Sequence, residues 1–548
     1  MKPVENQGAM TGPSFFDRLV TAIAPRWGFE RHKARLMLNA TGYGGYTGGR
    51  RDRRALRNYK PPEANADADI LRDLPDLRAR ARDLARNNPI ATGAIATTVT
   101  NVIGDGLQLQ ASIDGALLGM TDQQADAWEQ ASEREWALFS ASADFNGVQP
   151  FEELQALALR ALLESGDVFV VRRYRKDKGD VYGTKLQILE ADRVSNPDRA
   201  ADSDTIAGGV EVDKDGRPVA YHVSEKHPGA VVGLAKMKWT RVAARTPAGV
   251  QVVLHLYDRL RPEQTRGVPY LAPVIEHLAQ LGKYTEAEVA GAVMNAMIVA
   301  FTKTNADQTL APILGERGSA AANGDNLEAN EVEMGSAMQI HLRPNEEVQF
   351  PAPGRPNSQF DPFVQAFLRQ VGVALELPFE LLIKHFTASY SASRAALEMA
   401  WQYFRRRRTF VARRLCQVVY EWVMEEAIVM RRLEAPGYLD DPLVAAAYCG
   451  AEWIGPSRAS LNPKMEAEAD EIDMRAGVKT GEQVCLERTG GEIEKKIAQL
   501  GKERAMRDQA GLIPAPAPAA QPGKPSPSDD DARGDAEDET QQPKREQA

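Results

Sequence analysis

The sequence predicts an α+β fold in which helical segments flank a block of antiparallel strands. Between residues 167 and 258, short runs rich in β-branched and aromatic residues alternate with Gly/Asp turns. The segments on both sides carry apolar residues at helical spacing. From Ser393 to about Leu433 there is no proline and no glycine, which predicts one unusually long helix. At 548 residues, the chain is expected to form two to four compact regions.

The part of the chain before the strand block is expected to hold an arm and then helices. Residues 1–65 include the stretch GYGGYTGGRRDRR and little that could build a core, so this arm is expected to become ordered against another surface. Asn88-Pro89 supplies an N-cap with proline at the first helical position, and that helix is expected to end near Ile103. A short strand, LQLQA, follows, and a further helix is expected from Phe151 to Glu164.

Four runs make up the strand block, namely VFVVRRY, KLQILE, VEVDKDGRPVAYHV and VQVVLHLYD. Inside the third run, Asp213 to Gly216 resembles the opening of a calcium-binding loop, but the later ligands of that loop are missing. We therefore expect a hairpin turn at this point.

Helical spacing returns from Tyr270 to about Ala300, and residues 302–358 are mixed, with the strand-like runs AMQIHL and EEVQF. Asp361-Pro362 is expected to cap a helix that ends before Pro378. The polar segment from Lys384 to Ser393 then joins two helices. At about ten residues it is longer than most helix–helix connections, and such loops often carry function.

The long segment that begins at Ser393 predicts a helix of roughly 60 Å, at 1.5 Å per residue. Because no sustained heptad is visible, we interpret it as a strut in a large assembly and not as a coiled coil. Residues 440–510 predict a smaller helical region. The last 35 residues hold seven prolines and eight acidic side chains against four basic ones, so this tail is expected to be disordered.

Composition excludes several classes of protein. A formal net charge of −9 argues against a protein that clamps nucleic acid over most of its surface. The three cysteines, Cys416, Cys449 and Cys485, form no CxxC pair, so neither a zinc site nor a disulfide framework is expected. No signal-peptide pattern is visible, and the longest apolar run falls short of the roughly 20 residues that span a bilayer.

No enzymatic motif is present, so we expect no catalytic residues, no metal and no cofactor. The sequence lacks GxxxxGK[ST], HExxH and GxSxG, and its glycine-rich arm does not fit GxGxxG. Glu190 and Asp192 could be read as a catalytic carboxylate pair, but solvated carboxylates at the end of a strand are the simpler interpretation.

Six arginines lie within ten residues of the predicted long helix. They spread around most of its circumference, so no single stripe faces one partner. They could contact phosphates or pair with acids of a neighbouring subunit, and Glu421, Glu425 and Glu426 lie further along the same helix. We favour intersubunit pairing. These candidate residues are Arg405, Arg406, Arg407, Arg408, Arg413 and Arg414.

Six stretches in sequence order together resemble the lambda-type portal proteins of tailed phages. They are DLRARARDLARNNPIATGAIATTVTNVIGDGLQLQ, LQILEADRVSNP, GGVEVDKDGRPVAYHV, RPEQTRGVPYLAPVIEHLAQLGKYTEAEVAGAVMNA, ELPFELLIKHFTASYSASRAALEMAWQYFRRRRTF and AEWIGPSRASLNPKMEAEADEIDMRAGVKTGEQV. Each is only moderately specific, whereas the ordered series, which covers roughly residues 10–510, is strong.

The resemblance implies a multi-region portal fold that assembles into a ring, usually of twelve subunits, around a central channel. Together with the composition, it divides the chain into an N-terminal arm (1–65), a wing (66–268), a stem helix (269–300), a clip (301–359), a second stem helix (360–378), a tunnel loop (379–393), a long wing helix (394–435), a crown (436–512) and a disordered tail (513–548). The DNA-facing residues that it implies in the tunnel loop are Lys384, His385, Thr387, Ser389, Tyr390 and Ser391.

The implied function is a structural conduit at one capsid vertex, through which double-stranded DNA is packaged and ejected. The implied partners are further copies of the chain, double-stranded DNA, the large terminase subunit, the major capsid protein or scaffold, and a head-completion or tail adaptor protein, with no membrane. The protein is expected in the virion, and in the host cytoplasm during assembly. An acidic chain with few basic residues in its candidate loop suits a channel along which DNA must slide.

Two alternatives remain at this point. The terminase motor would need the phosphate-binding loop that this sequence lacks. Another capsid component, such as a scaffold or head-completion protein, is disfavoured by the length of the chain, the strand block and the long helix.

Overall fold

A computed structural model describes residues 58–230, 237–296, 300–303, 339–342, 359–386, 389–457, 463–489 and 493–510, with a few isolated positions before residue 58. It contains helices and sheets, in agreement with the predicted α+β class. The chain divides into two compact units. Unit 1 comprises Met1–Pro75 and Arg259–Arg266, and unit 2 comprises Asp76–Asp258 and Gly267–Ala548.

In unit 1, the short helix α3 (Ala66–Ile70) holds the segment Arg259–Arg266 through its acidic side chains. The side chain of Asn65 caps α3 by accepting a hydrogen bond from the Ala68 amide at 2.8 Å. Asp69 forms an ion pair with Arg261, and Asp67 accepts a hydrogen bond from the Thr265 amide at 2.8 Å. These bonds join two segments that are far apart in the sequence.

Unit 2 starts with helices, as predicted. The helix α4 (Leu74–Asn87) is followed by α5 (Pro89–Val102), whose start at the Asn88 cap is confirmed, with amides of Ile90 and Ala91 donating to the cap. The helices α6 (Gly115–Leu118), α7 (Asp122–Ser140) and α8 (Phe151–Ser165) follow. The predicted LQLQA strand is β1 (Gln108–Ala111), and it pairs antiparallel with the distant β11 (Ala451–Ile454).

The predicted strand block forms two antiparallel sheets. One has the order β3-β2-β8, with β2 (Asp167–Tyr174) between β3 (Thr184–Leu189) and β8 (Val253–Tyr257). The other has the order β4-β5-β6-β7, and its strands are Ile206–Ala207, Val210–Val212, Pro218–Ser224 and Trp239–Ala243. The hairpin turn predicted at Asp213–Gly216 is confirmed: Asp213 accepts hydrogen bonds from the amides of Asp215 and Arg217, and Gly216 has a φ of 78°.

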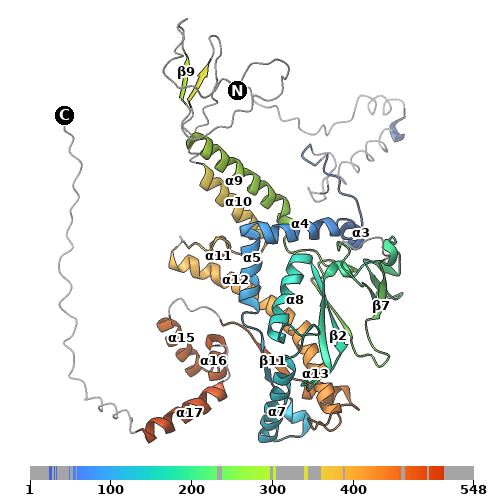
Figure 1. Ribbon diagram of the computed structural model, residues 1–548, viewed down its shortest axis with the longest axis vertical. Helices are drawn as coiled ribbons and strands as arrows, with labels where there is room; N and C mark the ends of the chain where they lie inside the picture. The colour runs from blue at the N-terminus through green and yellow to red at the C-terminus, as the bar shows by residue number, and fades with distance from the viewer. Residues whose placement is uncertain are drawn as a thin grey trace, which may run out of the picture. The chain divides into compact units, whose positions relative to one another are not determined.

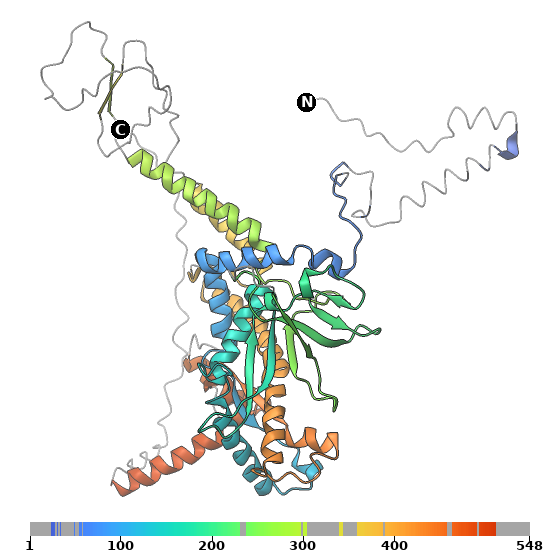
Figure 2. The same ribbon diagram turned by 45° about the vertical axis from the view of Figure 1, so that its right-hand side comes forward.

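The two helices on either side of the mixed segment pack together. In Figure 1, and from another side in Figure 2, α9 (Ile275–Ala296) and α10 (Phe360–Ala374) run side by side. Their contacts include Tyr284 with Phe363, whose ring centroids are 4.9 Å apart. Asp361 does not cap α10 as predicted. The helix begins two residues earlier, with Gln359 at the cap, so Asp361 lies in the first turn, where its charge still suits the helix dipole.

Between these helices only two short strands are described, β9 (Ala300–Lys303) and β10 (Gln339–Leu342), which pair in parallel. The strand β10 falls within the predicted run AMQIHL. The other predicted run, EEVQF, lies outside the described residues, as do most of the N-terminal arm and the tail.

The predicted long helix is present and continuous for forty residues, with one irregular turn. It consists of α12 (Tyr390–Val411), a π-helical turn (Ala412–Cys416) and α13 (Gln417–Val429). It begins three residues before Ser393. A short helix, α11 (Phe379–Ile383), precedes it. The helix α11 occupies residues that we assigned to the tunnel loop, and α12 starts at Tyr390, so the connection comprises only residues 384–389.

Aromatic side chains join the long helix to the N-terminal helices. Trp136 of α7 lies with its ring centroid 5.0 Å from Phe151, 5.4 Å from Trp453 and 5.8 Å from Tyr420. The remaining helices are α14 (Pro442–Tyr448), α15 (Pro463–Arg475), α16 (Gly481–Thr489) and α17 (Ile493–Gln509). Among the described residues, no helix combines the length and the apolar character needed to cross a bilayer.

Candidate functional site

The candidate loop connects α11 to α12 over residues 384–389. The chain leaves α11 through Lys384, whose φ of 55° is left-handed, and the His385 amide donates to the Glu380 carbonyl at 3.0 Å. Lys384 and His385 are exposed. Ser389 is the N-cap residue of α12, and its hydroxyl lies 3.3 Å from that of Ser391.

The structure corrects the predicted extent of this loop. Tyr390 and Ser391 belong to the first turn of α12, because the helix starts before Ser393. Thr387 lies outside the described residues, and only the backbone of Tyr390 is described. Among its described residues, the loop therefore presents Lys384, His385, the exposed ring of Phe386 and the hydroxyl of Ser389. Such a surface can meet phosphates without holding them tightly.

An apolar groove lies between α10, α11 and α12. It measures about 700 Å³, and its lining includes Val373, Leu377, Phe379, Met399 and Tyr403. Val373 is 82% exposed and Met399 71% exposed, which is unusual for large apolar side chains on helices. Arg406 and Glu376, 2.7 Å apart, form an ion pair at its rim.

The six arginines of the long helix separate into two groups. Arg407 forms an ion pair with Asp258, and Arg408 donates to the carbonyl oxygens of Asn101, Val102 and Pro456. Burial and the charge of Arg405 lower the pKa of Arg408 to about 10. Arg407 and Arg408 are therefore engaged by groups of their own subunit, and the intersubunit or phosphate role that we predicted for them stays a prediction.

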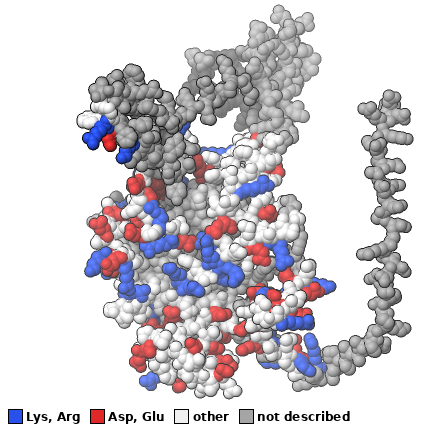
Figure 3. Space-filling model, turned by 180° about the vertical axis from the view of Figure 1, so that it is seen from behind, with Lys and Arg blue, Asp and Glu red and all other residues white. Residues whose placement is uncertain are grey.

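Three of the other arginines remain candidates for an outside partner. Arg405, Arg413 and Arg414 are exposed, whereas Arg406 has its partner at the groove. Lys and Arg side chains gather across the middle of the face drawn in Figure 3.

The acids that we named as possible partners of these arginines are used within the subunit. Glu425 forms an ion pair with Arg172 at 2.9 Å, and Glu426 accepts hydrogen bonds from the amides of Gly183 and Thr184. Glu421 accepts a hydrogen bond from the Gln417 side chain at 3.3 Å. Glu425 and Glu426 fasten the β2–β3 hairpin to α13, so an intersubunit partner for the arginines has to come from elsewhere.

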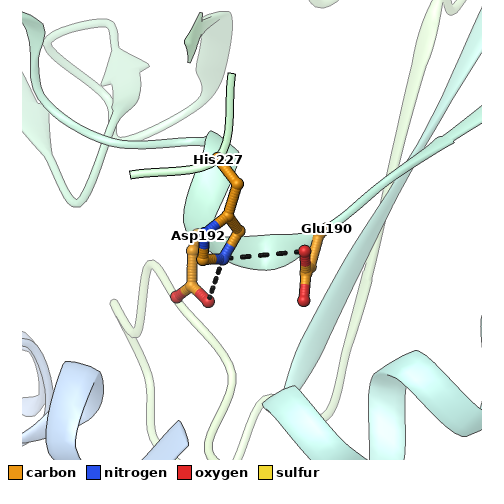
Figure 4. Close-up of side chains that lie close together, drawn as sticks. All are labelled: Glu190, Asp192 and His227. Atoms are coloured by element: carbon orange, nitrogen blue, oxygen red, sulfur yellow. Dashed lines mark hydrogen bonds and ion pairs between the residues drawn. The ribbon is translucent and has the colours of Figure 1, made fainter. Parts of the chain in front are cut away.

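Glu190 and Asp192 come close to His227, as Figure 4 shows. The His227 Nε2 atom lies 3.3 Å from Asp192 and 3.6 Å from Glu190. A histidine with two carboxylates could hold a divalent cation, and this is the one such group that the described part of the chain contains.

Two arginines argue against a metal at this position. Arg82 forms ion pairs with Asp192 and Glu190, and Arg78 lies 3.4 Å from Asp192 and 2.7 Å from the buried Asp167. The two guanidinium groups already balance the carboxylates and would repel a cation. We therefore interpret the cluster as an ion-pair network that fixes α4 to the end of the strand β3.

Sequence reasoning missed this network, although α4 carries a signal for it. Arg78 and Arg82 are four residues apart in RARAR, so they lie on the same face of the helix. Asp167, the partner of Arg78, is about ninety residues away in the chain and completely buried, and neither fact can be read from spacing.

Comparisons with known proteins cover most of the chain. Residues 52–408 match the model of a family described as "Phage portal protein, lambda family". Portal protein B of Escherichia phage lambda is 28% identical over 497 residues, which are 86% of this chain and 91% of that protein. The portal protein of Escherichia phage N15 is 28% identical over 499 residues, with the same two coverages. Among solved structures, the neck of a native GTA particle, computed with C12 symmetry, has a TM-score of 0.37 at 14% identity and covers 75% of this chain and 90% of that one.

Proposed function

Because the chain belongs to the lambda family of phage portal proteins, we propose that it forms the ring-shaped channel through which double-stranded DNA enters and leaves the capsid. The observation that carries this proposal is the family match over residues 52–408, with relatives aligned along 86% of the chain. A portal protein is a structural component of the virion at a capsid vertex. The terminase and scaffold alternatives are thereby set aside.

The exposed groove supports a ring. Large apolar side chains such as Val373 and Met399 would be costly to leave in water, and a neighbouring copy in a closed rotation would cover them in every subunit. Twelve is the expected number of subunits. Native mass spectrometry of the purified chain should show closed rings without nucleic acid, and a monomer alone at micromolar concentration would overturn the proposal.

The loop at residues 384–389 is proposed to face DNA in the channel, with Lys384, His385, Thr387 and Ser389 nearest to it. Its position supports this role, since it joins two helices and contributes few charges. Tyr390 and Ser391 would then face DNA from the first turn of α12.

Replacing residues 385–388 with a Gly/Ser linker of equal length tests the loop. The variant keeps the Ser389 cap and should still form rings, but particles that carry it should hold less nuclease-protected DNA. Lys384→Ala is the milder companion variant, because one exposed charge per subunit is screened by salt. Full-length protected DNA in particles with the linker would show that the loop faces another subunit.

Arg405, Arg413 and Arg414 are proposed to pair with carboxylates of a neighbouring copy. Their exposure supports an outside partner. The further proposed partners are the large terminase subunit during packaging, the major capsid protein or scaffold around the ring, and a head-completion or tail adaptor protein afterwards. Assembly would take place in the host cytoplasm.

A further inference from the structure

The β2–β3 hairpin and the short helix after it carry a group of basic side chains that no role above explains. Arg173 is on β2, and Arg175, Lys176 and Lys178 follow in the turn. Arg193, in the short 3₁₀ helix after β3, is close enough to Arg173 for their charges to interact. We call these five residues the hairpin patch. Arg173, Lys176 and Lys178 are exposed.

Much of the positive charge in the hairpin patch is not balanced by carboxylates. Arg173 donates to the neutral side chain of Gln187 at 2.9 Å, and Arg193 donates to the carbonyl oxygens of Ser224 and Glu225. Burial and the charge of Arg173 lower the pKa of Arg193, although Glu190 acts in the opposite direction. Two like charges brought together in this way are the arrangement that an anion would relieve.

The acids in the turn compensate only part of the patch. Arg175 lies 2.8 Å from Asp177, whereas Asp180 is used by the buried Lys185, also at 2.8 Å. Asp180 therefore balances a lysine outside the patch. Lys176 and Lys178 project from the turn as exposed charges.

The hairpin patch is built on a rigid base. The ring of Phe145 lies under both Arg173 and Arg175, with the guanidinium carbons 5.8 and 4.8 Å from its centroid. Asp144 shapes the loop that presents Phe145, because it accepts hydrogen bonds from the amides of Asn146 and Val148. A patch whose arginines are already positioned loses less conformational entropy when it binds a ligand.

This position is far from the candidate channel loop. The hairpin is fastened to α13 at Glu425 and Glu426, whereas the loop precedes Tyr390 at the other end of the same long helix. The 35 residues between Tyr390 and Glu425 span roughly 50 Å at 1.5 Å per residue. One short stretch of DNA in the channel could not be the ligand of both.

We propose that the hairpin patch is a second DNA-binding site, which contacts the phosphates of duplex DNA outside the channel. This inference rests on the proposed function, which makes duplex DNA the abundant polyanion beside each subunit. Each patch offers only a few phosphate contacts, so one subunit binds weakly. Repetition around the ring strengthens binding, and salt weakens it.

A closed circular duplex distinguishes binding at the hairpin patch from binding in the channel, because it cannot be threaded through a closed ring. Full-length rings are titrated with relaxed circular DNA at low salt, and binding is measured for the wild type and for Lys176→Glu with Lys178→Glu. The matched control is Lys464→Glu with Lys502→Glu, which makes the same charge change at two other exposed lysines. The hairpin variant should bind at least about tenfold more weakly, and the slope of log K against log salt should be shallower by about 2 for each patch that contacts the duplex.

Three results would overturn the proposal: no binding of circular DNA by the wild type, equal binding by the hairpin variant, or an equal loss in the control. Binding of a peptide of residues 528–540 in place of DNA would also overturn it and assign the patch to an acidic segment. If the wild type forms no rings, the proposed channel fails by itself. The same titration then tests the patch on single subunits with a short linear duplex.

Discussion

Asp192 shows how much the stability of one contact can depend on pH. Burial alone would raise the pKa of this carboxyl group, but the charges of Arg78 and Arg82 outweigh burial and hold the pKa below its ordinary value. A carboxyl group with a lowered pKa in the folded state stabilises the protein fully above its unfolded pKa of about 4. That contribution is lost as the pH falls below 4 and through the folded pKa.

Asp192→Asn should therefore destabilise the protein at pH 7, by about 2 kcal/mol, because two arginines lose a partner that is only partly exposed. The variant should also lose less stability than the wild type between pH 4 and pH 3. Thermal unfolding at a fixed protein concentration measures both effects. Glu190→Gln, at a more exposed carboxylate, should have a smaller effect. If the stabilities of Asp192→Asn and the wild type changed with pH in parallel, the pH dependence could not be assigned to Asp192.

At the scale of elements, local signals predicted most of the structure. The Asn88 cap, the Asp213 turn and the long helix are all encoded within a few residues of themselves, and all three are confirmed. The end of the loop was misplaced because Ser391, Ala392 and Ser393 are small residues without an apolar periodicity, which hides a helix start. The π-helical turn was not predicted either, since it adds only one residue to a regular spacing.

Ala396→Pro tests the long helix as an element. Proline there would remove one backbone hydrogen bond and clash with the preceding turn, at a cost of about 3 kcal/mol or more. Because Ala396 also lines the groove, rings should fail before the subunits unfold. Native mass spectrometry and circular dichroism report the two events separately. Ala396→Ser, which keeps the amide, should retain the rings, and normal rings in the proline variant would mean that this part of α12 is not needed for assembly.

At the scale of the whole molecule, the unpredicted features are contacts between distant parts of the sequence. The strand β1 pairs with β11 more than three hundred residues later, and Arg408 reaches back to the end of α5. Such contacts depend on how the elements pack, which spacing within one segment does not encode. The same holds for the groove, whose lining comes from three helices and whose exposed methionine reads in the sequence as an ordinary core residue.

Met399→Glu tests whether this groove is buried between subunits of the ring. In a single subunit Met399 is 71% exposed, so a charge there should change the stability of the subunit by less than about 0.5 kcal/mol. In a ring, the same charge would be buried in an apolar contact without a partner. Every interface of the ring would carry this substitution, so all of them would be weakened together. We expect monomers by native mass spectrometry at concentrations where the wild type is assembled.

Leu439→Glu changes a similarly exposed apolar residue in the loop after α13 and should leave the rings intact. If Met399→Glu rings form as readily as those of the wild type, the groove faces solvent in the assembled protein, and the contact between neighbours has to be sought on another face of the long helix.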